Sequence, residues 1–348
     1  MDMSLSSGNL SPLVSVIIPT YNGGDWLLDT ISSCLDQHGV SLEVIVVDDA
    51  SSDDTPERVA SAYPQVRLIQ QASNSGSGAA GRNTGLELSR GRYVKFLDHD
   101  DRLEPGSLSL EVAAAEKHQA DMVMSRWGDV RTDAQGEPME ASRRAFIPPE
   151  PERLLEAILL GEKVPYTAGV LYRRSFIADQ LWNSQLTIND DFDWFCRNAL
   201  RTERIIRLDH VSYYWRLHPR SIQGSQQFNA QAFVESVLIH NQIYSDIVVT
   251  LSDQQRLTAH FRRLLAAQLY RDLRVLARFA PARCWRTLRR IQELQPGFQP
   301  DAALEANRWF RMVSAWFSLK GSLRLYRWLL LLPDQFRFRG GQIRYFQA

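Results

Sequence analysis

The sequence predicts an α/β protein with a mostly parallel sheet and helices on both faces, followed by an all-α region. Two observations carry this prediction. Between residues 13 and 225, short apolar runs alternate with segments of helical spacing, which is the pattern of a parallel sheet. After residue 226 the strand-like runs stop and long helical segments follow. We therefore expect two domains, 13–225 and 226–348.

The predicted strands are short runs rich in aliphatic and β-branched residues. They cover 14–18, 43–47, 66–69, 92–97, 122–127, 169–172 and 205–214. We expect the first strand to stop at Pro19, because proline has no backbone N–H for the ladder. Residues 73–81 read as a loop rich in glycine and serine, and residues 131–151 as a surface loop or flap.

The predicted helices show apolar residues at three- and four-residue spacing. In the first of them, Leu27, Ile31 and Cys34 share one face. The helices of the α/β part cover 26–37, a segment from 55, a segment through 86–88, 108–119, 151–160 and 189–200. Those of the all-α region cover 233–249, 254–279, 283–294 and 302–319.

Composition is that of an ordinary soluble globular protein, with 44% hydrophobic and 23% charged residues in 348. The N-terminus lacks the features of a signal peptide, and no run of about 18 apolar residues predicts a membrane span. The three cysteines are far apart, odd in number and set among apolar residues. We expect reduced core thiols and a cytoplasmic protein.

The zero net charge hides an asymmetry between the two parts of the chain. Residues 226–348 hold 18 basic and 8 acidic residues, a net charge of +10, so the remainder carries −10. This division predicts two modules with different partners, and we expect no nucleic acid among them.

Polar clusters follow three of the predicted strands. They are Thr20–Asn22, Asp48–Asp49 and Asp98–Asp101. In parallel α/β sheets ligands bind beyond the carboxyl ends of the strands, so these clusters should meet at one rim. That convergence favours a binding site over three unrelated turns.

The third cluster holds three carboxylates, Asp98, Asp100 and Asp101, directly after a buried strand. They repel one another at neutral pH, and Mg²⁺ or Mn²⁺ would remove that repulsion because hard cations prefer oxygen ligands. The alternative is a solvated acidic turn before the helix that follows Pro105.

Four further features each allow two interpretations. Residues 76–81 fit the G-x-G-x-x-G pattern, but they follow the third strand rather than the first, so a dinucleotide site is disfavoured. Arg82, at a helix start, suits a phosphate or a surface salt bridge. The acidic residues within 190–193 either stabilise a helix N-terminus by complementing its dipole or include a catalytic base. Residues 213–221 contain hydrogen-bond donors that either bind an anionic group or are ordinary polar surface side chains.

The order of these motifs resembles the family 2 glycosyltransferases of GT-A fold. The matching segments are 16–22, 47–51, 80–85 and 97–101, with 190–197 similar to the family's Glu-Asp helix and 214–221 similar to its Tyr-Arg-His-Ser ending. Asp190 stands where the family has glutamate. The resemblance covers 13–225 and leaves the helical tail outside.

This resemblance implies a role for each motif residue. The nucleotide-binding residues would be Pro19, Thr20, Tyr21, Asn22, Asp48 and Asp49, with Asp49 bonding the base. Arg82 would contact the diphosphate region of the donor. Asp98 and Asp100 would be metal ligands, with Asp100 the more direct one and Asp101 behind them. His218 would ligate the metal or touch the diphosphate. Asp191 would be the general base, and the acceptor or diphosphate region would include Asp190, Trp194, Arg216 and Ser221. His99 occupies a position where a small residue is common, so the fit of the donor sugar can differ.

The resemblance implies an inverting, Mn²⁺- or Mg²⁺-dependent transfer of a sugar from a nucleotide-sugar donor to an acceptor hydroxyl. The acceptor would be a glycan, lipid-linked or protein-linked. Two alternatives remain, a non-catalytic nucleotide-sugar or glycan-binding protein of the same fold, and a Rossmann oxidoreductase. Arginines alternate with tryptophan and leucine along the tail. We expect this tail either to contact the inner face of the membrane peripherally, or to pack or form a homodimer.

Overall fold

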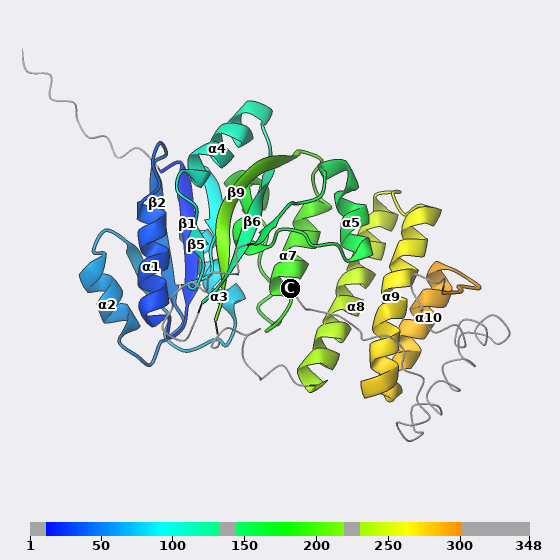
Figure 1. Ribbon diagram of the computed structural model, residues 1–348. Coiled ribbons are helices and arrows are strands. Elements are labelled where there is room, and N and C mark those ends of the chain that lie inside the picture. Colours follow the sequence, from blue (N-terminus) through cyan, green and yellow to red (C-terminus); the bar gives the residue numbers. More distant parts are fainter. Residues whose placement is uncertain (1–11, 133–143, 219–229, 301–348) are drawn as a thin grey trace, which may run out of the picture. The chain divides into compact units, whose positions relative to one another are not determined.

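The computed structural model describes residues 12–132, 144–218 and 230–300 (Figure 1). The chain divides into two compact units, one of residues 1–157 with 163–227 and one of 158–162 with 228–348. The assignment of separate glycosyltransferase and helical domains at 13–225 and 226–348 stays a prediction.

A mixed sheet forms the centre of the first unit, with nine strands in the described part of the chain. The strand order is β3-β2-β1-β4-β8-β6-β9-β5, and β7 pairs with β6. The strands are β1 Val14–Thr20, β2 Leu42–Asp48, β3 Arg67–Gln70, β4 Tyr93–Phe96, β5 Arg102–Leu103, β6 Met122–Arg131, β7 Arg144–Phe146, β8 Val170–Arg173 and β9 Ile205–Leu217. The first four strands are parallel, whereas β8 runs antiparallel to both of its neighbours.

Helices cover both faces of this sheet, as predicted. Val16 and Ile18 of β1 lie in one core with Leu27 and Ile31 of α1. Ile17 points to the other face, where α3 packs. The helices of this part of the chain are α1 Gly24–Leu35, α2 Thr55–Ala62, α3 Gly78–Leu88, α4 Ser107–His118, α5 Leu154–Leu160, α6 Arg174–Ile177 and α7 Asp190–Ala199.

Pro19 lies inside β1, so the prediction that it ends this strand was wrong. It pairs in register with Val47 of β2. The carbonyl of Ile17 accepts from Leu97 on the β4 side, and β4 pairs with β1 no further than Ile17. The backbone groups of successive strand residues bond to the two neighbouring strands in turn, so Pro19, like Ile17, faces the β4 side. The ladder with β4 has already ended there, and no hydrogen bond is lost by the missing N–H.

Helix α3 begins at Gly78, inside the segment predicted as a loop. The Ser77 hydroxyl caps it by accepting from the Ala79 backbone N–H at 3.3 Å. Gly81 and Gly85 of this helix face β1: a Cβ on Gly81 would lie 2.9 Å from Cβ of Pro19, and one on Gly85 2.3 Å from Cγ2 of Ile17. Glycine at these positions therefore lets α3 pack closely on the sheet. The predicted flap at 131–151 likewise contains regular structure, since β7 pairs with β6.

The second unit is helical, as predicted. Its helices are α8 Ala230–Asp253, α9 Ala259–Phe279 and α10 Cys284–Leu294, and α9 packs against both α8 and α10. Asn241 of α8 joins the three helices, because it donates to Asp272 of α9 at 3.0 Å and accepts from Thr287 of α10 at 3.0 Å. The predicted helix 302–319 lies outside the described residues. None of the helices described here has the length and apolar character needed to cross a bilayer.

Candidate functional site

The loops that follow β1 and β2 are bonded to each other at the carboxyl ends of the strands. The Asn22 backbone N–H donates to the Ser51 hydroxyl at 2.8 Å, and the Asn22 side-chain oxygen accepts from the Ser52 backbone at 2.9 Å. The backbone N–H of Asp49 donates to the Thr20 carbonyl at 2.8 Å. The structure thus places two of the predicted clusters side by side.

The carboxylates of Asp48 and Asp49 are buried and bonded within this rim. Asp48 accepts from the backbone N–H of Ser51 at 3.1 Å and from its hydroxyl. Asp49 accepts from the Ser75 backbone N–H at 2.9 and 3.0 Å and from the Ser75 hydroxyl at 2.9 Å. Asp49 therefore fixes the segment before α3 against β2.

Thr20 and Tyr21 present contrasting side chains at the end of β1. The Thr20 hydroxyl oxygen is buried and has no hydrogen-bond partner among the described residues. Tyr21 beside it is 44% exposed, a large share for an aromatic ring. The nucleotide-binding roles of Pro19 to Asn22, Asp48 and Asp49 stay predictions.

The acidic loop after β4 holds carboxylates in different environments. Asp101 is buried, and its Oδ1 accepts from the Arg216 backbone N–H at 3.1 Å. Burial, with the charges of Asp100 and Asp98, raises the pKa of Asp101 well above its usual value. Burial opposes ionisation of Asp100 too, but its hydrogen bond with His218 and the nearby His99 outweigh this, so the pKa of Asp100 is lowered. The Nε2 atom of His218 lies 3.1 Å from Oδ2 of Asp100.

Arg216 holds this loop against α1. Its guanidinium donates to the backbone carbonyl of Asp100, to the Asp29 carboxylate at 2.6 Å and to the Thr30 hydroxyl at 3.0 Å. The side chain is buried among these partners. In this structure the donors of Arg216 bond the protein itself, and its predicted contact with the acceptor or diphosphate region stays a prediction.

Trp26 at the start of α1 is part of this site and was missed from the sequence. Its ring stacks on the imidazole of His218, with 4.9 Å between centroids and 18° between planes. The Arg216 guanidinium carbon lies 4.7 Å from the Trp26 ring centre. A tryptophan placed directly after the Tyr21–Gly24 turn was the available signal, but its contacts come from β9, far along the chain.

Arg82 of α3 joins the acidic loop to the start of α7. Its guanidinium bonds Asp98 at 2.5 Å and Asp190 at 2.8 Å, and it lies over Trp182 at 4.5 Å. Burial alone would lower its pKa, but Asp98 and Asp190 outweigh that effect and raise it. The predicted metal cluster and the predicted base cluster therefore meet at one buried cation.

Asp191 differs from its neighbour Asp190 in having no cationic partner in the described part of the chain. Its Oδ1 accepts from the Phe192 backbone N–H at 2.7 Å. Burial, followed by the charge of Asp190, raises the pKa of Asp191 to about 6. A carboxylate with this pKa is ionised at neutral pH and still accepts a proton more readily than an ordinary aspartate.

Trp194 of α7 lies beneath the site. It is fully buried and stacks on Trp182, with ring centroids 4.6 Å apart and planes 3° apart. Asn83 holds Trp182 in place by donating to its carbonyl at 2.9 Å and accepting from its N–H at 2.7 Å. The ring is thus covered by protein, and the predicted place of Trp194 in the acceptor or diphosphate region stays a prediction. Ser221, assigned to the same region, lies outside the described residues.

A metal ion would have to take part of its coordination from elsewhere. In the described segments, no three histidine, cysteine or acidic side chains are grouped so that they could hold an ion by themselves. Asp100 and His218 offer an oxygen and a nitrogen donor 3.1 Å apart, while Asp98 is engaged by Arg82.

Comparison with known families decides the class of this domain. Residues 15–180 match the model described as "Glycosyl transferase family 2". This part of the chain is a family 2 glycosyltransferase domain. The prediction made from the motifs is confirmed.

Curated relatives of this family 2 domain are similar over part of their length. A "Succinoglycan biosynthesis protein ExoO" of Rhizobium meliloti is 37% identical over 149 residues, which is 42% of this chain and 41% of the relative. A "Poly(ribitol-phosphate) beta-N-acetylglucosaminyltransferase TarP" of Staphylococcus aureus is 38% identical over 119 residues, 33% and 36% of the two chains. The "Uncharacterized glycosyltransferase EpsJ" of Bacillus subtilis is 29% identical over 227 residues, 61% and 63%. The chain spans less than two thirds of the length of these relatives.

Solved structures of S. aureus TarS 1-349 share the fold. The complex with UDP-GlcNAc aligns with a TM-score of 0.64 at 21% identity, and the complex with UDP with 0.59 at 22%. Each alignment covers 90% of this chain and 89% of the other. The fold of the family 2 domain is thus GT-A, followed by a helical region, as predicted.

Proposed function

We propose that this chain transfers a sugar from a nucleotide-diphosphate donor to an acceptor hydroxyl with inversion at the anomeric carbon. The observation that carries the proposal is the bridge made by Arg82. One guanidinium binds Asp98 at 2.5 Å and Asp190 at 2.8 Å, so the donor side and the acceptor side of the site adjoin. Direct displacement requires the attacking oxygen and the anomeric carbon to lie about 3–3.5 Å apart, so the donor and the acceptor must bind at adjoining positions.

Asp191 is the general base in this proposal. It accepts the proton of the acceptor hydroxyl while that oxygen attacks the anomeric carbon. Its pKa of about 6 favours this role, since it is charged at pH 7 and binds a proton readily. Asp190 is less suited because Arg82 already holds its carboxylate.

The residues present fit a divalent cation that takes few protein ligands. Mg²⁺ commonly binds one or two carboxylates and completes its shell with phosphate and water. Asp100 and His218 would hold Mn²⁺ or Mg²⁺, with Asp98 joining them on release from Arg82. The ion would supply positive charge to the departing diphosphate. Arg216 keeps the loop in place for this by bonding the Asp100 carbonyl.

A UDP-sugar is the first donor to test, since the TarS structures of the same fold hold UDP and UDP-GlcNAc. For the acceptor we propose a glycan, lipid-linked or protein-linked, with a role in polysaccharide biosynthesis of the kind that the name of ExoO indicates. We also propose that the C-terminal helices give peripheral contact with the inner face of the membrane, with homodimer formation as the competing role.

A donor screen tests the proposed reaction. The chain is incubated with Mn²⁺ and UDP-, GDP- or dTDP-sugars, and release of the nucleoside diphosphate is followed. We expect turnover of one nucleotide class, with Asp191→Asn lowering it by roughly 10²-fold, the usual contribution of a general base, while donor affinity stays nearly unchanged. If Asp190→Asn is the damaging change and Asp191→Asn is mild, the base is misassigned.

Calorimetry separates the metal from the base. Asp100→Asn removes a negative ligand and should abolish most of the Mn²⁺-dependent gain in nucleotide affinity without unfolding the chain. Unchanged Mn²⁺-dependent affinity would reject Asp100 as a ligand. Donor binding without turnover in any nucleotide class would instead favour the non-catalytic binding protein.

A further inference from the structure

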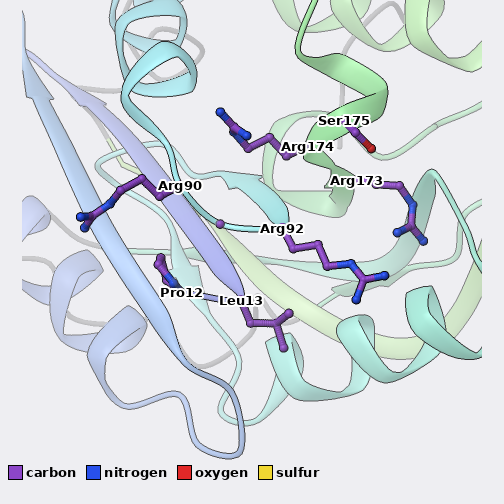
Figure 2. A pocket seen from close by; sticks show the side chains of 8 residues that line it. Pro12, Leu13, Arg90, Arg92, Arg173, Arg174 and Ser175 are labelled. Carbon is purple, nitrogen blue, oxygen red and sulfur yellow. The ribbon is translucent and has the colours of Figure 1, made fainter. Parts of the chain in front are cut away.

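A second polar region lies at the opposite edge of the sheet from the candidate site. A pocket of about 400 Å³ opens beside the residue before β1, the turn before β4 and the junction of β8 with α6. Arg90, Arg92, Arg173 and Arg174 line it, together with Ser175 (Figure 2). These are the amino ends of β1 and β4, whereas the acidic loop and the nucleotide-binding rim follow the carboxyl ends.

The fold itself concentrates these arginines. The Arg174 backbone N–H donates to the Arg92 carbonyl at 2.9 Å, which fixes the two segments against each other. The residues that line the pocket include four arginines and no acidic residue. Four like charges around one depression repel one another, and an oxyanion removes that repulsion.

Nearby carboxylates neutralise this group only in part. Glu43 pairs with Arg90 at 3.0 Å, and Glu116 pairs with Arg92 at 2.9 Å. Asp121 lies 3.8 Å from Arg173, but it pairs with Arg204 at the shorter distance of 2.6 Å. Arg174 donates to the Ser89 hydroxyl at 3.2 Å and has no ion pair within the described ranges.

The paired arginines still present donors to solvent. The side chains of Arg90 and Arg92 are 60% and 57% exposed in spite of their ion pairs. In the Arg92–Glu116 pair both side chains are exposed, and such pairs are weak, about 0.2–1 kcal/mol, so a ligand with more negative charge competes with this pair readily. The ordinary alternative is that these pairs only stabilise the surface.

The arrangement also indicates the kind of ligand. Figure 2 shows the four arginine side chains spreading apart, with Arg90 and Arg92 pointing in opposite directions. Guanidinium groups that surround a depression suit an extended group with several charged oxygens better than a single small ion. We propose that this pocket binds a ligand carrying several phosphate oxyanions, either a soluble polyphosphate or the phosphate headgroups of an anionic lipid surface.

Titration calorimetry of the full chain with sodium tripolyphosphate tests this proposal. EDTA is present, so that divalent ions at the candidate active site do not contribute. We expect Arg92→Gln/Arg174→Gln to weaken binding by about tenfold or more, since each lost charged hydrogen bond removes a substantial share of the affinity. Arg92→Lys/Arg174→Lys keeps the charge and should lose less. Arg289→Gln, which removes an exposed arginine paired with Glu293 elsewhere in the chain, is the matched control.

Vesicle flotation distinguishes the two sources of phosphate. Flotation of the wild type with phosphatidylglycerol vesicles, lost in the Gln double variant and absent with phosphatidylcholine, identifies a lipid surface. Tripolyphosphate binding that the Gln double variant loses, while flotation is absent or is unchanged in that variant, identifies a soluble ligand. Equal tripolyphosphate affinity of the wild type and the Gln double variant, or no binding of either probe, would overturn the proposal. Because the pocket lies away from the rim, donor turnover should be unchanged in these variants, so the proposed reaction is tested separately.

Discussion

At the scale of single residues, the ionisation of Asp191 and its dependence on Arg82 can be tested. Asp191 has a pKa raised to about 6 by burial and by Asp190, while Arg82 acts in the opposite direction. The base is active only when ionised, so kcat/KM should fall about tenfold per pH unit below pH 6. Arg82→Gln should move this acidic limb to higher pH, because the cation that favours ionised Asp191 is lost. A pH profile that bends near pH 4 in the wild type would contradict the assignment.

The same raised pKa predicts an effect on stability. In the native state the charged form of Asp191 is disfavoured, so the free energy of unfolding decreases as pH rises from about 4 through 6. Asp191→Asn removes this penalty. We expect it to stabilise the chain by roughly 1 kcal/mol at pH 8 and by much less at pH 4.5, measured by urea unfolding. A loss of stability at pH 8 would show that the carboxylate is favourably bonded.

Trp26 is expected to orient His218 through ring stacking. Trp26→Leu should weaken Mn²⁺-dependent nucleotide binding by about tenfold, the usual scale for residues that orient a metal ligand, and Trp26→Phe should restore most of it. Nucleotide affinity without Mn²⁺ should stay unchanged, which a general loss of structure would not produce. Equal loss in both variants, with and without Mn²⁺, would assign Trp26 to packing alone.

At the scale of elements, β4, α4 and β6 are joined by a buried ion pair. Lys95 of β4 donates to both oxygens of Glu111 of α4 at 2.7 and 2.9 Å, and Ser125 of β6 donates to the same carboxylate at 2.6 Å. Both charged side chains are fully buried. They lie directly behind the strand that ends in the acidic loop, so this pair fixes α4 against β4.

Removing one partner of this pair should lower the free energy of unfolding more than removing both. Lys95→Met leaves the Glu111 charge buried without its cation, a change that usually costs about 3–5 kcal/mol. The double variant Lys95→Met/Glu111→Leu should be clearly more stable than that single variant in urea unfolding. Glu293→Gln, which affects the exposed pair with Arg289 on α10, is expected to cost less than about 1 kcal/mol and serves as the control. Additive effects of Lys95→Met and Glu111→Leu would show that the two side chains are not coupled.

Periodicity and turn chemistry were enough to predict most of the elements, though not the short β5, β7 and α6, and to predict that polar clusters meet at one rim. They did not place Pro19, because its tolerance within β1 depends on which neighbouring strand needs its N–H. They did not place the start of α3 either, because glycines that look like a loop allow this helix to pack closely on the sheet. The motifs identified the site residues, but they do not show what each side chain contacts, so the roles of Arg216 and Trp194 stay predictions. A motif gives residue types but not their contacts. Arg216 donates to Asp29 and to the acidic loop, and Trp194 stacks against Trp182.

At the scale of the whole molecule, the charge asymmetry is reflected in the surface of the helical unit. Helix α10 buries Leu288, Ile291 and Leu294, so its apolar face packs within this unit. Its other face is exposed and carries arginines, with Trp285 58% exposed and Arg286 over its ring at 5.3 Å. Exposed tryptophan beside arginine is typical of residues that enter the headgroup region of a bilayer.

This exposed face predicts a membrane contact that can be separated from the arginine pocket of the first unit. Each basic residue near an anionic surface contributes about 1 kcal/mol, and Trp285 adds apolar burial. We expect the full chain to float with phosphatidylglycerol vesicles at low salt, and Trp285→Ser/Arg286→Gln/Arg289→Gln to reduce the floated fraction several-fold. Trp285→Phe should retain most of it, because the apolar contact remains. Loss of flotation in Arg92→Gln/Arg174→Gln but not in the α10 variant would assign the membrane contact to the pocket. A change in oligomeric mass of the α10 variant, without any effect on flotation, would make this face an interface between copies of the chain.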